Sequence, residues 1–274
     1  MSRFKRFKSL ASYPFFVFLI FSRNVVYKAL IRASHFLNFN YPGLRFETRI
    51  NKPDKDKINI LCLGDSVTFG WNLKFKYSYP QLLNERLKHS KYKAVNLGVG
   101  GSSVKDALSR AKRDITRGKP YLAIVNFGLN DGMLARTKEN CSTALRYSYK
   151  SRDYCPKISL KDFERYYLEL IKLLDENKIN ILIAGISQVS LDYPQGKGDD
   201  FKKKQRQVYK IYNDKIKEIS RINDVLYIGL WDLFEDAPSL NYFLDNDGIH
   251  PNKKGSQLIS EKIYDFLKNN GLLD

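Results

Sequence analysis

Short apolar runs alternate with longer segments of helical periodicity along most of this chain. The runs are rich in Ile, Val and Leu and carry few charges, which is typical of strands buried on both faces of a parallel sheet. The segments between them place apolar residues three or four positions apart, which predicts helices that cover such a sheet. The predicted strands span residues 58–63, 93–97, 121–127, 179–186 and 225–230, and the predicted helices span 79–87, 104–116, 160–176, 201–222 and 253–267.

This alternation predicts a three-layer α/β/α domain with a doubly wound, five-stranded parallel sheet. The domain is expected to begin near Lys57, because residues 33–56 have the composition of a connector. Residues 38–43 are rich in turn formers, and residues 51–56 are polar and interrupted by proline. The predicted organisation is an N-terminal segment and linker over residues 1–56, followed by one globular domain over residues 57–274.

The N-terminal segment combines positive charge with an apolar run. Four basic residues within the first nine positions precede a mostly apolar stretch over residues 10–21, a pattern typical of a secretory signal or signal anchor. A spanning helix needs roughly 20 apolar residues, and extending the run to residue 31 brings in Arg23 and Lys28. No small-x-small cleavage site follows. We expect residues 10–31 to act as an uncleaved anchor or interfacial helix; a cleaved signal and a soluble packed helix are the alternatives.

The chain is strongly basic, with 47 Lys and Arg residues against 29 Asp and Glu residues and a formal net charge of +18. Such a charge favours anionic surroundings, namely a membrane surface, an acidic glycan or a nucleic acid. The lysines are scattered over many predicted helix faces, and no nucleic-acid-binding module is recognisable, so no nucleic-acid partner is expected. The simplest interpretation is a solvated basic surface.

Three cysteines constrain the redox environment. Cys62 lies inside the first predicted strand, where a buried thiol acts as a small hydrophobic side chain. Cys141 and Cys155 bracket a loop-like stretch and either form a disulfide in an oxidising compartment or remain free thiols. No Cys-x-x-Cys or His-rich spacing predicts a zinc site, and neither a metal nor a cofactor is expected.

Residues able to carry chemistry follow four of the predicted strands. Ser66 follows the first strand, Gly101 the second and Asn130 the third, while Asp247 and His250 follow the fifth. The carboxyl ends of parallel strands open at the same edge of a sheet, where such folds bind ligands. We therefore expect these residues, which are far apart in sequence, to meet in one site.

The residue types fit nucleophilic attack on a carbonyl. A serine hydroxyl needs an adjacent base, and His250 is the candidate because imidazole titrates near neutral pH. Asp247, three residues earlier, can hold the imidazole tautomer and stabilise its cation. The N–H groups of Ser66 and Gly101 and the amide of Asn130 are candidate donors to the oxyanion that forms. The predicted catalytic residues are Ser66, Asp247 and His250, and the predicted oxyanion hole is Ser66, Gly101 and Asn130.

Together, the four sequence blocks that contain these residues resemble those of the SGNH hydrolase superfamily, also called the GDSL esterase/lipase family. The resemblance covers the chain after about residue 57 and departs from the name-giving motif only where valine replaces leucine, an apolar position without chemistry. Gly100 is the alternative to Gly101 if the second turn is shifted by one residue. The matching blocks, in family order, are Gly64-Asp65-Ser66-Val67, Asn96-Leu97-Gly98-Val99-Gly100-Gly101, Gly128-Leu129-Asn130-Asp131 and Asp247-Gly248-Ile249-His250-Pro251.

The resemblance implies a flavodoxin-like sheet, a metal-independent mechanism, and ester hydrolysis or acyl transfer. The short segments between the blocks leave no room for a large lid, which favours a small acyl group such as acetyl, possibly on a glycan. If the basic N-terminus stays inside, the domain lies outside the cytoplasmic membrane; a cytoplasmic location is the alternative. Two other functions remain open: a surface-glycan O-acyltransferase with the same triad, and a non-catalytic, membrane-tethered binding module.

Several neighbouring residues have simpler expected roles. Asp65 is expected to shape the turn before Ser66, and Asp131 to cap or brace its loop. Trp71 either lines the acyl pocket or only packs. His35 and His89 belong to no motif and are expected to be surface or packing residues.

Overall fold

The computed structural model describes residues 52–118, 120–135, 154–234 and 239–273. All of them belong to one compact unit, residues 49–274. The segment expected at a membrane, residues 10–31, lies outside the described residues, as do His35 and Cys141. Among the helices that these ranges contain, none combines the length and the hydropathy that crossing a bilayer requires. The predicted domain start near Lys57 stays a prediction.

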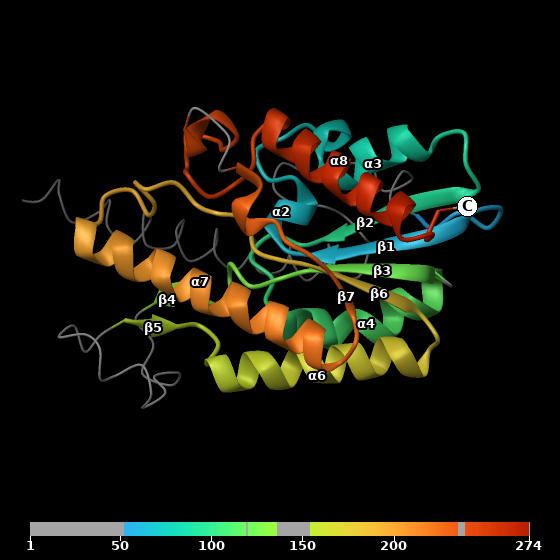
Figure 1. The fold of residues 1–274 in the computed structure, drawn as a ribbon, viewed down its shortest axis with the longest axis horizontal. Helices are drawn as coiled ribbons and strands as arrows, with labels where there is room; N and C mark the ends of the chain where they lie inside the picture. Colours follow the sequence, from blue (N-terminus) through green and yellow to red (C-terminus); the bar gives the residue numbers. More distant parts are fainter. Residues whose placement is uncertain (1–51, 119, 136–153, 235–238, 274) are drawn as a thin grey trace, which may run out of the picture. The chain divides into compact units, whose positions relative to one another are not determined.

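Five parallel strands form the central sheet, as predicted (Figure 1). Their spatial order is β2-β1-β3-β6-β7, which is the 2-1-3-4-5 order of flavodoxin-like folds when only these strands are counted. The chain adds β2 on one side of β1 and the later strands on the other side, so the strand order reverses beside β1. The carboxyl end of β1 therefore lies where such folds bind ligands. The strands are β1 (Ile58–Gly64), β2 (Tyr92–Gly98), β3 (Pro120–Asn126), β6 (Asn180–Ala184) and β7 (Leu226–Ile228).

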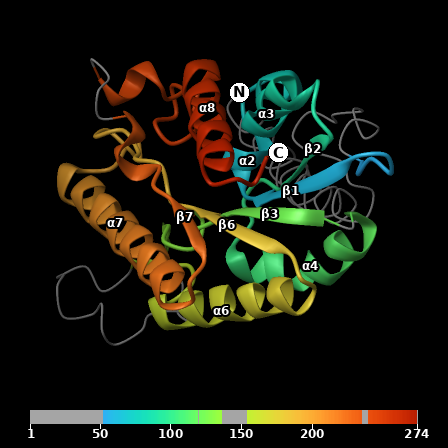
Figure 2. The same ribbon diagram turned by 45° about the vertical axis from the view of Figure 1, so that its right-hand side comes forward.

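Helices cover both faces of the sheet and complete the three layers. Helices α3 and α8 lie on one face, and α4, α6 and α7 lie on the other (Figures 1 and 2). This arrangement explains why the strands are continuous apolar runs, because neither face meets water. The helices are α3 (Tyr79–Leu87), α4 (Val104–Gly118), α6 (Leu160–Glu176), α7 (Asp199–Ile222) and α8 (Lys253–Asn269).

The core is centred on β1 and β3. Residues 60–63 and 122–125 are at most 1% exposed. Cys62 lies among them as a free, fully buried thiol, and burial raises its pKa. The prediction for Cys62 is therefore confirmed.

Helix α6 shows how the sequence specifies both the start and the packing of an element. The hydroxyl of Ser159 accepts a hydrogen bond from the Asp162 N–H at 3.1 Å, which caps the helix. The buried side chains of the helix recur at helical spacing, and the Tyr167 hydroxyl donates to the Phe127 carbonyl just beyond β3 at 3.0 Å. Helix α6 thus fixes the end of the strand that precedes Asn130.

A buried ion pair lies under the ends of β1 and β2. Arg110 of α4 bonds to Asp114 at 2.9 Å, and both side chains are 5% exposed. The guanidinium also donates to the carbonyl oxygens of Leu97, at 2.8 Å, and Gly64, at 3.4 Å. Arg110 therefore ties α4 to the last residues of two strands, immediately before the turns that carry Ser66 and Gly101.

The short elements were not foreseen from the sequence, because two to four residues carry no measurable periodicity. Strands β4 (Leu134–Ala135) and β5 (Cys155–Pro156) pair antiparallel within a region expected to be irregular. Cys155 is disulfide-bonded, and its expected partner Cys141 lies outside the described residues. The other short elements are α2 (Ser66–Phe69), η1 (Phe75–Tyr77), η2 (Trp231–Phe234) and η3 (Leu240–Tyr242).

Candidate active site

Ser66 is the first residue of α2, and only Asp65 separates it from the end of β1. The carboxylate of Asp65 accepts a hydrogen bond from the Val67 N–H at 2.9 Å and so caps this helix, which confirms that Asp65 shapes the turn. A Cβ atom on Gly98 would lie 2.2 Å from the Phe69 nitrogen. The backbone at the end of β2 therefore packs directly against the backbone of α2, without side chains between them. This contact supports the turn that carries Ser66.

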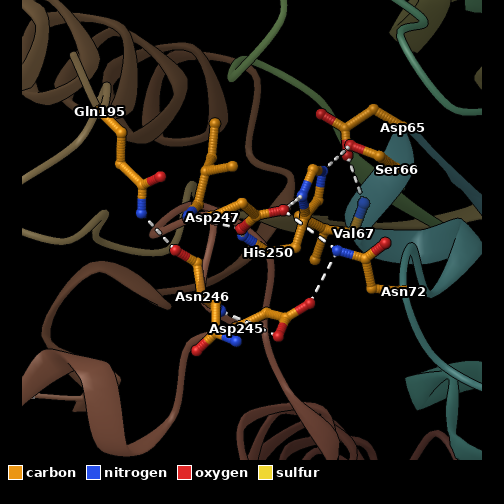
Figure 3. Close-up of polar contacts among 10 residues, drawn as sticks. Asp65, Ser66, Val67, Asn72, Gln195, Asp245, Asn246, Asp247 and His250 are labelled. Atoms are coloured by element: carbon orange, nitrogen blue, oxygen red, sulfur yellow. Dashed lines mark hydrogen bonds and ion pairs between the residues drawn. The ribbon is translucent and has the colours of Figure 1, made fainter. Parts of the chain in front are cut away.

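The three predicted catalytic side chains meet at this turn (Figure 3). The Ser66 Oγ lies 2.8 Å from the Nε2 of His250. The Nδ1 of the same ring lies 2.6 Å from the Oδ2 of Asp247. An ionised Asp247 accepts only, so Nδ1 carries the proton and Nε2 accepts from the serine hydroxyl. Residues separated by 184 positions in sequence thus form one line of hydrogen bonds.

The Asp247 carboxylate is held by more than the imidazole. Its Oδ1 accepts from the N–H groups of Ile249, at 3.1 Å, and His250, at 3.0 Å. Burial pushes the pKa of Asp247 upward, but the hydrogen bonds from His250 and Ile249 outweigh it, so the pKa lies below its ordinary value. The carboxylate is therefore ionised at neutral pH, as a partner of an imidazolium must be.

The loop that carries Asp247 and His250 is closed on itself. The Asp245 N–H donates to the His250 carbonyl at 2.8 Å, and the Asn252 N–H donates to the Phe243 carbonyl at 2.9 Å. The Asn252 side chain then accepts from the N–H groups of Lys254 and Gly255 and caps α8. Asp247 and His250 are thus fixed relative to the long helix α8.

The candidate oxyanion donors lie in the loops after β1, β2 and β3. As the first residue of α2, Ser66 has an N–H without a partner inside its helix. Gly101 has φ +78° and open space around its α-carbon, and its N–H makes no hydrogen bond with any described residue. The Nδ2 of Asn130 donates to the Oδ2 of Asp65 at 3.3 Å, which leaves its second N–H for a ligand.

Two buried carboxyl groups accept hydrogen bonds from these loops. Asp65 is 1% exposed and Asp131 is 0% exposed. Burial raises the pKa of Asp65 to about 6 and that of Asp131 to about 8. Asp131 accepts from the Val104 N–H, the first of α4, at 3.0 Å. This bond joins the loop of Asn130 to the loop of Gly101 and confirms the bracing role predicted for Asp131.

We expect the free energy of unfolding of the Asp131→Asn variant to fall less steeply with rising pH than that of the parent protein. The pKa of Asp131 is about 8 in the folded state and about 3.9 in an unfolded chain. Between these values the unfolded state releases its proton while the folded state keeps it, so the free energy of unfolding falls as the pH rises. Asparagine does not titrate and keeps the oxygen that accepts from Val104. Urea unfolding at about pH 5, 6.5 and 8 measures the slope, and identical slopes in both proteins would contradict this assignment.

Asn72 and Asp245 were not singled out from the sequence, and they contact Asp247 and His250 respectively. The Nδ2 of Asn72 donates to Asp245 at 2.7 Å and to Asp247 at 3.3 Å (Figure 3). No spacing could have indicated this contact, which spans 173 residues. Trp71 stacks on the His250 ring with 5.7 Å between centroids and 25° between planes. His89 is exposed, as expected.

Comparison with known proteins identifies the family. The model of the GDSL-like Lipase/Acylhydrolase family matches residues 62–258, which include every predicted site residue. The chain belongs to this family. The resemblance drawn from the four blocks is thereby confirmed.

Relatives and solved structures agree with this assignment. The GDSL-family chain is 22% identical to the lipoprotein YqeF of Bacillus subtilis, over 76% of this chain and 88% of the relative. It is also 22% identical to an arylesterase of Vibrio mimicus, over 74% of this chain and 85% of the relative. A lipase/acylhydrolase of Enterococcus faecalis has the same fold, with a TM-score of 0.61 at 19% identity, over 79% of this chain and 97% of the other. The chain is therefore an ester hydrolase of the GDSL family.

Proposed function

We propose that Ser66 is the nucleophile of this esterase, His250 its general base and acid, and Asp247 the residue that orients His250. The observation that carries the proposal is the unbroken pair of hydrogen bonds from Ser66 through His250 to an ionised Asp247. Geometry of this kind is what activates a hydroxyl that is otherwise a poor nucleophile.

Acylation follows from these contacts. The Ser66 Oγ forms a bond to the ester carbonyl carbon while its proton passes to the Nε2 of His250. The carbonyl electrons move to the oxygen, and the oxyanion accepts from the N–H groups of Ser66 and Gly101 and the amide of Asn130. When the carbon–alkoxy bond breaks, His250 returns the proton to the leaving alcohol. One such oxyanion donor is worth about 2.7–4 kcal/mol of transition-state stabilisation.

Deacylation repeats the sequence with water. His250 takes a proton from water as the water oxygen bonds to the acyl carbon. The tetrahedral intermediate then releases the Ser66 oxygen, which recovers the proton, and the carboxylic acid leaves. Throughout, the negative charge of Asp247 stabilises the imidazolium.

The substrate of this proposal is an ester with a small acyl group such as acetyl, possibly carried on a glycan. Between Ser66 and Gly101 the chain forms only α2, η1, α3 and β2, so this part of the site has no inserted lid. The name of the Vibrio mimicus relative, an arylesterase, supports small aryl esters as first substrates.

The proposed location is a membrane-anchored protein whose catalytic domain lies outside the cytoplasmic membrane. The basic and apolar N-terminal sequence supports an anchor. The disulfide-bonded state of Cys155 supports an oxidising compartment. The Bacillus subtilis relative is named a lipoprotein, which agrees with export and attachment.

The test uses the full chain in dodecyl maltoside, a detergent without an ester bond. Hydrolysis of p-nitrophenyl acetate, butyrate and octanoate is followed beside Ser66→Ala. We expect the highest kcat/KM on acetate and a fall of kcat by at least about 10⁴-fold in Ser66→Ala. A preference for octanoate would overturn the small acyl group, and an equally active Ser66→Ala would overturn the nucleophile.

An acceptor distinguishes the two remaining functions. The same assay is repeated with xylo-oligosaccharide, and the sugar is weighed by mass spectrometry. An acetylated sugar formed at the expense of acetate would assign acyl transfer. A folded protein that neither hydrolyses the esters nor reacts with a fluorophosphonate would overturn the catalytic proposal and leave a binding module.

A further inference from the structure

Asn72 connects two carboxylates at the back of the triad. Its amide Nδ2 donates to the Oδ2 of Asp245 at 2.7 Å and to the Oδ2 of Asp247 at 3.3 Å. The second oxygen is the one that accepts from the His250 ring. Asp247 therefore accepts from four N–H groups, two on each oxygen, which fills the acceptor capacity of a carboxylate.

Trp71, the preceding residue, contacts His250 in the same loop. Its ring lies nearly parallel to the His250 imidazole, with centroids 5.7 Å apart. An aromatic face at this distance restricts rotation of the imidazole and attracts it in its cationic form. Two consecutive residues thus contact the base and the acid of the triad, and both come from the segment that follows the nucleophile helix.

The backbone of this segment is shaped for these contacts. Gly70 ends α2 with φ +79°, and Asn72 has φ +59°. A non-glycine residue with positive φ is uncommon, and Asn tolerates that conformation better than most residues. The Trp71 N–H donates to the Ser66 carbonyl at 3.0 Å, so the position of the segment is tied to the nucleophile itself. Strained backbone of this kind is concentrated at functional sites.

We propose that Trp71 and Asn72 form a clamp that positions the acid–base loop, residues 245–250, against the nucleophile turn, with Asp245 as the anchor of Asn72. Both are positioning residues. The clamp keeps Asp247 aligned with His250 although a second carboxylate lies close by, because the Asn72 amide donates to both carboxylates. This assignment rests on the proposed function, since it concerns the alignment of the proposed triad.

The electrostatic consequence is specific. Asp245 lines a polar cavity of about 140 Å³ with Asn246 and Gly248, so its carboxylate faces a space open to solvent. Without the Asn72 amide, Asp245 and Asp247 would face each other with one donor group fewer. The added negative potential would favour the imidazolium over the neutral base. Among the described residues, Asp65 interacts with His250 and Tyr193 interacts with Asp247, and Asp192 lines the same cavity as Asp245.

The test compares variants of the full chain by the rate at which a fluorophosphonate modifies Ser66. In this reaction the Oγ bonds to phosphorus, fluoride leaves and His250 takes the proton, so the rate reports the nucleophile–base pair without any assumed substrate. Asn72→Gly removes the amide and accommodates the positive φ. Asn72→Asp keeps the shape but turns the donor into a third carboxylate. Asn180→Ala, an exposed asparagine with one hydrogen bond at the opposite edge of the sheet, is the matched control.

We expect Asn72→Gly to react about tenfold more slowly than the parent near neutral pH, with the acid limb of its pH–rate profile moved to higher pH. Asn72→Asp should react more slowly still, and Trp71→Ala should also slow the reaction. Asn180→Ala should match the parent. Circular dichroism and melting temperature confirm that each variant is folded.

Two results would overturn the clamp alone: an Asn72→Gly protein modified at the parent rate, or one slowed without any shift of the acid limb, which would indicate a merely structural effect. A parent protein that is inert to both ester and fluorophosphonate would instead overturn the proposed function, and the clamp with it.

Discussion

Ser66→Ala, His250→Ala and the double variant are expected to lose nearly the same activity, on the order of 10⁴- to 10⁶-fold in kcat. The reason is the single line of hydrogen bonds from Ser66 Oγ to His250 Nε2 and from Nδ1 to Asp247. Once the hydroxyl is gone, the base has no proton to accept, and once the base is gone, the hydroxyl is not activated. The effects should therefore not add. Steady-state hydrolysis of p-nitrophenyl acetate by all three proteins measures this.

Asp247→Asn is expected to lose about 10⁴-fold, because an amide at this position favours the wrong imidazole tautomer. Ser109→Ala and His89→Ala remove an exposed serine and an exposed histidine away from the site and should retain parent activity. If the double variant lost the product of the two single effects, Ser66 and His250 would act independently and the triad would be wrong.

Arg110→Ala is expected to lower the free energy of unfolding by about 3–5 kcal/mol. Both partners of the Arg110–Asp114 pair are 5% exposed, so removal of the guanidinium leaves Asp114 without its buried counterion. It also removes the donor to the carbonyl oxygens of Leu97 and Gly64. Urea or guanidinium unfolding of the full chain measures the change.

A matched control lies three residues along the same helix. Arg113 also pairs with Asp114, at 3.2 Å, but its side chain is 33% exposed, so Arg113→Ala should cost about 1 kcal/mol or less. The Arg110→Met/Asp114→Leu pair removes both charges and should recover much of the loss. Equal effects of Arg110→Ala and Arg113→Ala would show that the buried pair has no special importance.

The long elements of the fold were predictable because their signals are local. Helices α3 and α6 begin and end where the apolar spacing predicted, at Tyr79–Leu87 and Leu160–Glu176. Strand ends were less accurate: the run over residues 179–186 predicted a longer strand than the observed Asn180–Ala184. Pairing with the short strand β7 sets that limit, and a single strand's sequence does not contain its partner's length.

The meeting of Ser66, Asp247 and His250 was also predictable, because these residues lie in loops after recognisable strands and the topology brings those loops together. Asn72 and Asp245 were not, since a lone asparagine and an acidic residue in turn-rich sequence are ordinary composition. Their contact depends on a positive φ and on a loop 173 residues away. The sequence left two roles open for Trp71, to line the acyl pocket or only to pack. Its stacking on His250 is seen only in the structure.

Cys62 gives this protein a built-in chemical reporter. It lies in mid-strand on β1, opposite Asn96 of β2 and Ile124 of β3, and it is free and fully buried. An alkylating reagent needs an accessible thiolate, so it can reach this sulfur only when the central strand separates from its neighbours. The alkylation rate of Cys62 therefore measures how often β1, the strand that precedes Ser66, separates from β2 and β3. Exposed backbone groups report only local fraying of the fold. The proposed reaction uses Ser66 and no thiol, so Cys62 remains available for this measurement.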